Sequence, residues 1–223
     1  MAIFDIQILI QTILYFCAFI TGFVISIPIG VNRIEFQGLC ILYSEIDWTS
    51  NNQFILHASN DLNCSFAIYL SVFACIFYGL GLGIYNGYAL YKSTKDPTIG
   101  SQMWVMPFIL MNSLVTLVML VSSCMISVGF SSFCNGIKKN GNRCDLFENT
   151  KWKNLKDNSE FDSGNYFKFL TVAQIASWTS FLIWLCQVAL GIMRLIRNRR
   201  QRSQNMDISD KDTKPIATVE PTE

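Results

Sequence analysis

Cysteine is the residue type whose chemistry and spacing say most about this chain. Four of its eight cysteines lie at or between the ends of long apolar stretches: Cys40, Cys64, Cys134 and Cys144. In an oxidising compartment these four would pair as two disulfides, for which three connectivities exist. We favour Cys40–Cys64 with Cys134–Cys144, because this scheme closes two short loops. Pairing between the two loops stays open as the alternative.

Catalytic and metal-binding chemistry has little support in the sequence. His57 is the only histidine, and we interpret it as a surface residue of an Asn-rich segment. Cys134 and Cys144 suit a disulfide better than a zinc site. The glycines between Gly79 and Gly83 lie in an apolar stretch that a nucleotide cannot reach. We therefore expect a protein that is not an enzyme and that uses no metal or cofactor.

Four long apolar stretches must position these cysteines, and each could cross a membrane. With 51% hydrophobic and only 15% charged residues, the chain is more apolar than an ordinary soluble domain. A helix needs about 20 residues to cross a hydrocarbon core roughly 30 Å thick. The run from Trp104 to Cys134 contains no charged side chain. The predicted spans are residues 6–29, 66–91, 104–129 and 166–195.

These spans predict one domain, residues 1–195, because they are stable only when packed together. Pro28 and Gly30 are expected to end the first span. The loops at 32–63 and 131–165 would lie on one side of the membrane, and residues 196–223 would form a disordered tail. The first loop contains short β-prone runs, which predict a small antiparallel sheet. In the second loop, turns are expected at Asn135-Gly136 and Asn140-Gly141.

The orientation follows from basic residues and from cysteines. An even number of spans puts both termini on one side, and a basic cluster directly after the fourth span indicates that this side is cytoplasmic. The four loop cysteines fall on the opposite side, which is then extracellular or luminal. We interpret the cluster as an anchor for topology and for contact with anionic lipid. Its members are Arg194, Arg197, Arg199, Arg200 and Arg202.

Small and polar residues inside the spans predict how the helices pack. Gly79, Gly83 and Gly87 recur at every fourth residue, which favours close contact with a neighbouring helix of the same chain over dimerisation. Acidic and basic residues, the usual marks of ion or proton paths, are missing between the ends of the spans. The remaining polar residues are interpreted as hydrogen-bonding links between helices. They are Asn86, Asn112, Gln174 and Gln187.

Several segments resemble the transmembrane protein 179 family. They are FCAFITGFVISIPIG followed by EFQGLCILYSE at the first exit from the membrane, SVGFSSFCN after the third span, and FLTVAQIASWTSFLIWL in the fourth span. The resemblance covers residues 13–195 and includes both pairs of loop cysteines. This family is placed among claudin-like four-span proteins, which implies a left-handed bundle capped by a small extracellular β-sheet built mainly from the first loop. Trp48 lies between Cys40 and Cys64, but the Gly-Leu-Trp motif of true claudins is absent. The resemblance therefore does not imply a role in sealing tight junctions.

These observations favour a multi-pass membrane protein of the plasma membrane or secretory pathway that works through contacts. We expect an accessory or organising subunit that contacts the lipid bilayer and binds another membrane protein or a second copy of itself. The net charge of +1 gives no reason to expect nucleic acid as a partner. One alternative is an oligomeric channel or transporter, in which Asn112, Gln174 and Gln187 would face water. Another alternative is adhesion between cells through the loops.

Overall fold

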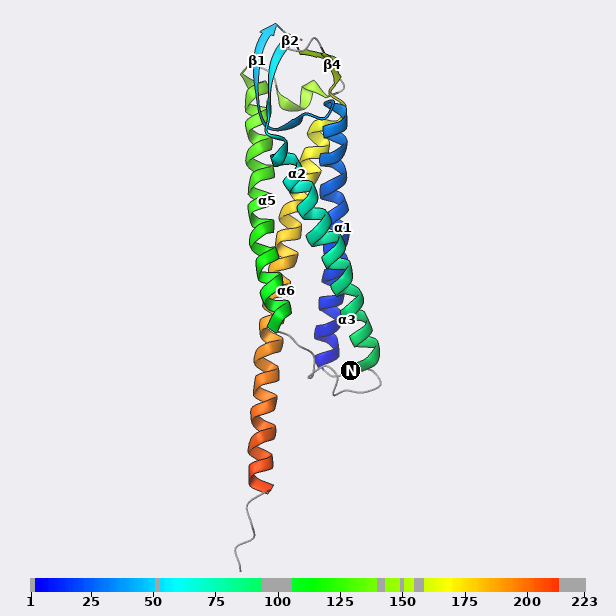
Figure 1. Cartoon of the computed structure of the whole chain (residues 1–223), viewed down its shortest axis with the longest axis vertical. Helices are drawn as coiled ribbons and strands as arrows, with labels where there is room; N and C mark the ends of the chain where they lie inside the picture. Colours follow the sequence, from blue (N-terminus) through cyan, green and yellow to red (C-terminus); the bar gives the residue numbers. More distant parts are fainter. Residues whose placement is uncertain are drawn as a thin grey trace, which may run out of the picture.

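The computed structural model describes residues 3–50, 53–93, 106–139, 143–148, 151–154 and 159–212. Four helical stretches in this part of the chain are long and apolar enough to cross a membrane. They form an elongated bundle with a small sheet at one end (Figure 1). The predicted four-span bundle with a β-sheet is therefore confirmed. We call the sheet and the short helix beside it the cap, and the opposite end, where α1 begins, the terminal end.

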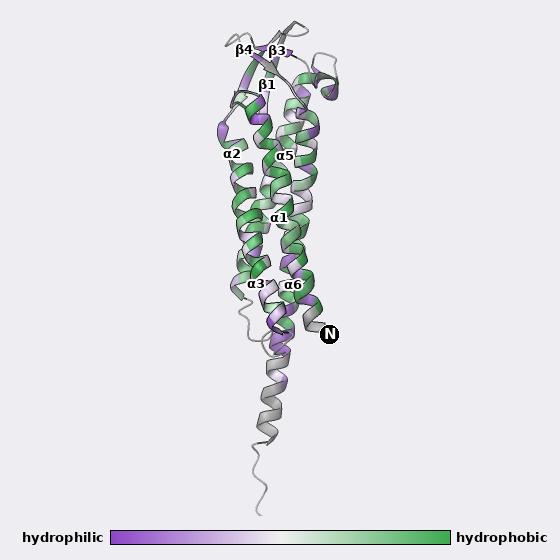
Figure 2. Ribbon diagram, turned by 90° about the vertical axis from the view of Figure 1, so that its right-hand side faces the viewer, coloured by the Kyte–Doolittle hydropathy of each residue, from purple (hydrophilic) through white to green (hydrophobic). Residues whose placement is uncertain are grey.

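Six helical segments form the four spanning helices, because the second spanning helix consists of three consecutive segments. The helical segments of the bundle are α1 (Ile3–Glu35), α2 (Asp61–Leu70), η1 (Ser71–Tyr78), α3 (Gly79–Ser93), α5 (Met106–Lys138) and α6 (Tyr166–Asp212). Segment η1 is wound as a π-helix between α2 and α3. α1 packs against both α6 and α3, and α5 packs against α6. Apolar residues gather along the bundle, and polar residues gather at its two ends (Figure 2).

The first helix continues past the residues expected to end it. Pro28 lies inside α1, and the helix runs on to Glu35. A proline removes only one hydrogen bond of a helix, and neighbouring helices support the rest. The helix ends at Glu35, just before Gln37 and Gly38, which both have positive φ; the Gly38 N–H donates to the Arg33 carbonyl at 2.7 Å. A glycine in this conformation is a common helix stop.

The other helices also reach beyond the expected spans. Cys64 lies in α2, and Cys134 lies in α5. Asn135-Gly136 is helical, so the predicted turn there is wrong. A 33-residue helix such as α5 is about 50 Å long and extends well beyond a hydrocarbon core of roughly 30 Å. The predicted turn at Asn140-Gly141 and the start of the third span at Trp104 lie outside the described residues.

α6 begins at Tyr166, where the fourth span was expected to begin, but it ends much later. We expected a disordered tail from residue 196, whereas the structure continues the helix to Asp212. Residues 197–212 contain four Arg and two Gln, which are good helix formers. Extending a helix that already exists also avoids the cost of nucleation.

The sheet joins both loops. Its strands are β1 (Cys40–Ser50), β2 (Gln53–Ser59), β3 (Lys151–Asn154) and β4 (Ser159–Asp162), in that order across the sheet. β1 pairs with β2, and β3 with β4, in antiparallel fashion, as the short β-prone runs of the first loop predict for β1 and β2. β2 pairs in parallel with β3. The second loop thus supplies half of the strands, which the sequence analysis did not anticipate.

Two hydrophobic cores stack along the bundle. The membrane core joins the four spanning helices around Tyr15, Met119 and Trp184, which are at most 3% exposed. The cap core lies between the sheet and the cap ends of the helices, around Phe36, Phe133 and residues of β1 and β2. The sheet is therefore packed onto the bundle through buried side chains.

Candidate functional site

The two disulfides join each loop to a spanning helix. Cys40 at the start of β1 pairs with Cys64 in α2, 24 residues later. Cys134 in α5 pairs with Cys144, 10 residues later, at the start of η2 (Cys144–Phe147). This is the within-loop scheme. Each bond fastens a segment of the cap to a helix that spans the membrane, so the cap cannot move far from the bundle.

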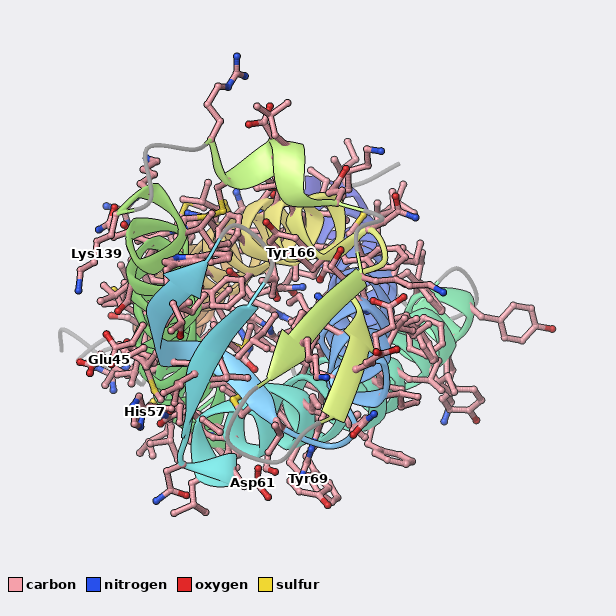
Figure 3. The ribbon with its side chains drawn as sticks, turned by 90° about the horizontal axis from the view of Figure 1, so that it is seen from above. Glu45, His57, Asp61, Tyr69, Lys139 and Tyr166 are labelled. Atoms are coloured by element: carbon pink, nitrogen blue, oxygen red, sulfur yellow. A yellow bond between two sulfur atoms is a disulfide. The ribbon has the colours of Figure 1, made fainter. Side chains whose placement is uncertain are left out.

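Aromatic rings fill the space under the sheet. The rings of Phe36 and Phe133 meet edge to face, with centroids 6.4 Å apart, and each also meets Tyr166 edge to face. The Tyr166 hydroxyl donates to the Cys144 carbonyl. Seen from above, Tyr166 lies near the middle of the bundle (Figure 3). This cluster joins α5, α6 and the residue that follows α1 to η2 of the cap.

β1 packs directly on α5 at two glycines. A side chain at Gly129 would collide with Leu42 and Tyr43, since an added Cβ would lie within 2.9 Å of both side chains. Tyr43 has a φ of 65°, at an irregularity of the β1–β2 pairing. Gly136, two turns further along α5, accepts a 3.1 Å hydrogen bond from the Trp48 indole through its carbonyl. Both glycines allow the strand to lie close to the helix.

The outer face of β1 and β2 is polar and exposed. Glu45, Asp47 and His57 are exposed, whereas Ile46 and Leu56 point into the cap core. His57 pairs with Glu45 across the strands, and its Nε2 lies 3.5 Å from a carboxylate oxygen of Asp47. The expected surface position of His57 agrees with this arrangement. Within the described residues, no group of three His, Cys, Asp or Glu could hold a metal ion.

Two ion pairs lie where the spanning helices meet the cap. Arg33 of α1 pairs with Asp61 at the start of α2, at 3.2 Å. Glu148, after η2, pairs with the Lys168 ammonium at 3.2 Å and also accepts from the Lys168 backbone N–H at 3.0 Å. A carboxylate near the N-terminus of a helix interacts favourably with the helix dipole. One ion pair thus joins α1 to α2 beneath the sheet, and the other joins the segment after η2 to α6.

The glycine face of the second span lies against α1. A Cβ added at Gly79 or Gly83 would meet Tyr15 at 3.5 Å, and one at Gly87 would meet Thr12 at 3.7 Å. This is the contact within one chain that the spacing favours. The distances are ordinary van der Waals contacts, so alanine would also fit.

The tightest contact between α1 and the second span was not found from the sequence. A Cβ added at Gly22 would lie 2.8 Å from the Cβ of Cys75 and 3.2 Å from the Ser71 carbonyl oxygen. Both residues belong to the π-helical segment η1. A single glycine in an apolar stretch has no spacing signal, and the bulge of a π-helix has none either. Gly22 is thus a position where only hydrogen fits.

Asn112 forms a hydrogen-bonded link in the membrane core. It is 3% exposed; its amide nitrogen donates to the Tyr15 hydroxyl at 2.8 Å, and its carbonyl oxygen accepts from the Tyr78 hydroxyl at 3.0 Å. The Trp184 ring stacks on Tyr78 and meets Tyr15 edge to face. All four spanning segments thus meet at one polar and aromatic cluster.

Two of the other polar residues also link helices. Gln187 is fully buried and donates to the Gln11 carbonyl at 2.8 Å, and Gln174 donates to the Ser127 hydroxyl at 3.2 Å. Asn86 differs, because its amide donates to the Leu82 carbonyl of its own helix.

The arginine cluster divides into two kinds of residue. Arg194 is only 4% exposed, and its guanidinium lies 3.5 Å from the Gln11 amide oxygen. It therefore faces the bundle, and the expectation that it contacts lipid headgroups is wrong. Arg199 and Arg200 are exposed, and Arg197 is partly exposed. The period of the helix explains the division, since residues three or four apart share a face.

Four spanning helices, two disulfides and a small sheet formed by both loops define a claudin-like membrane protein. A family model described as "Transmembrane protein 179/179B Claudin domain" matches residues 7–217. The chain belongs to this family. It is similar to the transmembrane protein 179B of Danio rerio, with 24% identity over 221 residues, covering 97% of this chain and 93% of that protein. No solved structure matches.

Proposed function

We propose that the protein is a non-enzymatic accessory or organising subunit that binds another membrane protein through the outer face of its cap. The observation that carries this proposal is the joining of both loops into one folded unit. They share a sheet, a buried core and two disulfides to the spanning helices. Such a unit loses little conformational freedom on binding, which favours affinity.

The orientation is part of this proposal. The cap faces the exterior or the lumen, because disulfides persist in oxidising compartments. Both termini face the cytoplasm, where the exposed Arg199 and Arg200 lie beyond the fourth span. The membrane is then the plasma membrane or a membrane of the secretory pathway.

The polar residues of the spans support a binding role over transport. Asn112 and Gln187 are buried within a single chain, and each bonds to a neighbouring helix. They are not on a surface that could line a pore between subunits. Replacing them with leucine would weaken the bundle, whereas a transport role would require loss of solute flux in an intact bundle.

The test uses the full chain in cells, with a photo-crosslinking amino acid placed at Asp47. The expected result is one recurrent membrane protein, identified by mass spectrometry after purification in mild detergent. Reversing the charge of the neighbouring Glu45 with lysine should reduce this product. The matched control places the crosslinker at Leu110, which is 70% exposed and lies at the end of α5 far from the cap.

The same experiment can contradict the proposal. Recovery of the uncrosslinked chain alone, or an identical set of products from Asp47 and Leu110, would exclude a partner on the cap. Products that contain only copies of this chain would favour a self-associating pore or an adhesive role. Flux in proteoliposomes and cell-aggregation assays, with and without the Glu45 change, would then separate those two functions.

A further inference from the structure

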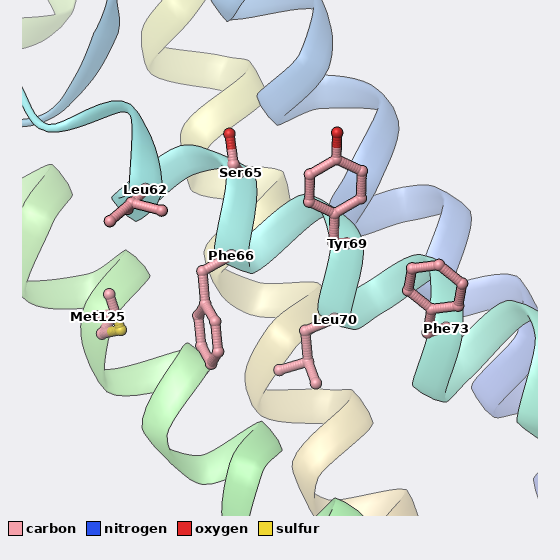
Figure 4. A pocket seen from close by; sticks show the side chains of 7 residues that line it. All are labelled: Leu62, Ser65, Phe66, Tyr69, Leu70, Phe73 and Met125. Carbon is pink, nitrogen blue, oxygen red and sulfur yellow. The ribbon is translucent and has the colours of Figure 1, made fainter.

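The outer surface of the bundle is apolar along the spans and becomes basic at the terminal end of α6. On the second span, Phe66, Leu70 and Phe73 line an open groove whose walls carry no charged side chain (Figure 4). On α6, no charged residue lies between Lys168 and Arg194, and exposed arginines follow at positions 199 and 200. Because charged side chains are costly inside a bilayer, this change marks the edge of the hydrocarbon core.

Ser203 lies a short distance beyond this edge, and its side chain is exposed. A headgroup layer adds about 5–8 Å to each side of the hydrocarbon core. With Arg194 at the edge of the core, the helix carries Arg199 and Arg200 about 8–9 Å outward and Ser203 about 14 Å outward. The two arginines therefore reach the outer part of the headgroup layer, and Ser203 lies in the adjacent water.

The residues before Ser203 are those that one class of protein kinase recognises. The segment is RNRRQRS, residues 197–203. Basophilic protein kinases bind an arginine three residues before the serine through carboxylates of their peptide groove, and Arg200 occupies that position. Ser209, the other serine of α6 beyond the span, has Met206 at this position. The pattern therefore selects Ser203.

The helix around Ser203 can open to enter a kinase groove, which requires an extended peptide. Beyond Arg200, α6 projects from the bundle with no other described helix beside it (Figures 1 and 2). The helix ends at Asp212, and an isolated helix shorter than about 12–15 residues is only marginally stable in water. Local unwinding of this part of α6 therefore costs little.

From the arginine at the recognition position, the exposure of Ser203 and its place just outside the membrane surface, we propose that Ser203 is a phosphorylation site for a basophilic protein kinase. The co-substrate is ATP with Mg²⁺. The Ser203 oxygen bonds to the γ-phosphorus, the bond from this phosphorus to the β-phosphate oxygen breaks, and ADP leaves. The hydroxyl proton passes to the catalytic aspartate of the kinase. This site rests on the cytoplasmic orientation proposed above and is independent of the partner on the cap.

The phosphate changes the charge of the arginine face of α6. Residues three and four apart share a helix face, so Ser203 lies on the face of Arg199 and Arg200. A phosphoserine carries a charge of about −1.5 to −2 at pH 7, which balances these two arginines. Basic segments beside a membrane are attracted to anionic lipid, and phosphorylation weakens this attraction. Phosphorylation of Ser203 therefore releases the end of α6 from an anionic membrane surface.

The first test maps phosphate on the full chain. Mass spectrometry of the protein from cells treated with a phosphatase inhibitor should find phosphate on Ser203. In nanodiscs, calmodulin-dependent protein kinase II with ATP and Mg²⁺ should modify Ser203 and not Ser209. Arg200→Ala should slow this reaction at least about tenfold, the effect of one charge-assisted hydrogen bond. Arg197→Ala is the matched control and should leave the rate unchanged.

The second test measures release from the membrane by hydrogen exchange of the backbone amides of residues 197–205. Exchange should be slower in nanodiscs of equal parts phosphatidylserine and phosphatidylcholine than in phosphatidylcholine alone. Phosphorylation of Ser203 should speed exchange at least about fivefold in the anionic discs, the equivalent of one arginine contact with lipid. In phosphatidylcholine the change should be about twofold at most. Ser203→Ala, treated with the same kinase, should keep the slow exchange.

The outcomes separate this site from the proposed orientation. A C-terminal tag that antibodies reach after selective permeabilisation of the plasma membrane shows that the tail is cytoplasmic. With the tag accessible, absence of phosphate on Ser203 would overturn the site. A tag that is inaccessible would overturn the orientation itself. An equal rate for Arg200→Ala would contradict recognition through arginine, and unchanged exchange after phosphorylation would contradict release from the membrane.

Discussion

The cap and the terminal end close the same bundle by different means. At the cap, two disulfides, a four-stranded sheet and a cluster of aromatic rings hold the helices together. At the terminal end, hydrogen bonds between α1 and α6 do so: Gln7 donates to the Leu190 carbonyl, Gln187 to the Gln11 carbonyl, and Arg194 lies at the Gln11 amide. One end is joined by covalent bonds, whereas the described residues of the other end meet through hydrogen bonds and side-chain packing.

This difference fits the proposed orientation. Disulfides do not persist in a reducing cytoplasm, so helices on that side need other links. Buried amides and a guanidinium provide them, at roughly 0.5–2 kcal/mol for each hydrogen bond inside a membrane protein. The cap should therefore be the more rigid end and the terminal end the more adaptable one.

The largest expected effect is loss of a disulfide. Replacing Cys40 and Cys64 with serine should lower the free energy of unfolding by about 3.5 kcal/mol, and replacing Cys134 and Cys144 by about 2.8 kcal/mol, because the second loop is shorter. Unfolding in mixed detergent micelles measures both values. The exposed Cys186 is the control, and Cys186→Ser should change little. Equal effects at all three sites would show that the cap is not held by these bonds.

An intermediate effect is expected midway between the two ends. Gly22→Ala places a methyl group against Cys75 and the Ser71 carbonyl, and overpacking of this kind costs about 1–3 kcal/mol. Gly83→Ala is the matched control, because its new methyl would be 3.5 Å from the nearest atom. It should be neutral or slightly stabilising, since alanine favours the helix. If the two variants unfold alike, the close contact at Gly22 is not required.

The smallest of the three effects is expected at the terminal end. Arg194→Ala removes a buried hydrogen-bonding cation and should cost about 1.5 kcal/mol, whereas the exposed Arg199→Ala should stay within about 0.5 kcal/mol. A cysteine introduced at Gln7 or at Leu190 is labelled faster when the terminal end opens, so its labelling rate measures whether this end opens alone. A loss that reaches the cap as well would mean that the two ends are not independent.

Most of the fold could be predicted because few backbone structures can cross a membrane. Apolar length identifies the spans, and four cysteines outside the spans identify the disulfide-bearing loops. The ends of the helices were less predictable. Pro28 suggested a stop that the helix does not make, and the true stop depends on the backbone of Gln37 and Gly38. Asn135-Gly136 resembles a turn in isolation but lies in a helix that continues from the membrane.

The candidate site was less predictable because it depends on contacts between distant segments. The parallel pairing of Gln53 with Lys153 joins residues 100 positions apart, and neither strand has a signal for the other. The role of Arg194 depends on which face of α6 meets Gln11, and a basic cluster does not reveal this. Gly79 and Gly83 were recognised because they repeat, whereas Gly22 stands alone.

The same parallel pairing has a consequence for how the protein is made. β1 and β2 are synthesised before the second span, whereas β3 and β4 follow the third. The Cys40–Cys64 bond can close once α2 has emerged, but the sheet must wait until two further spans have entered the bilayer. Completion of the sheet therefore requires that the first three spans have been inserted, whereas the fourth span follows β4 in the chain. A chain whose second or third span fails to insert would therefore lack the complete sheet.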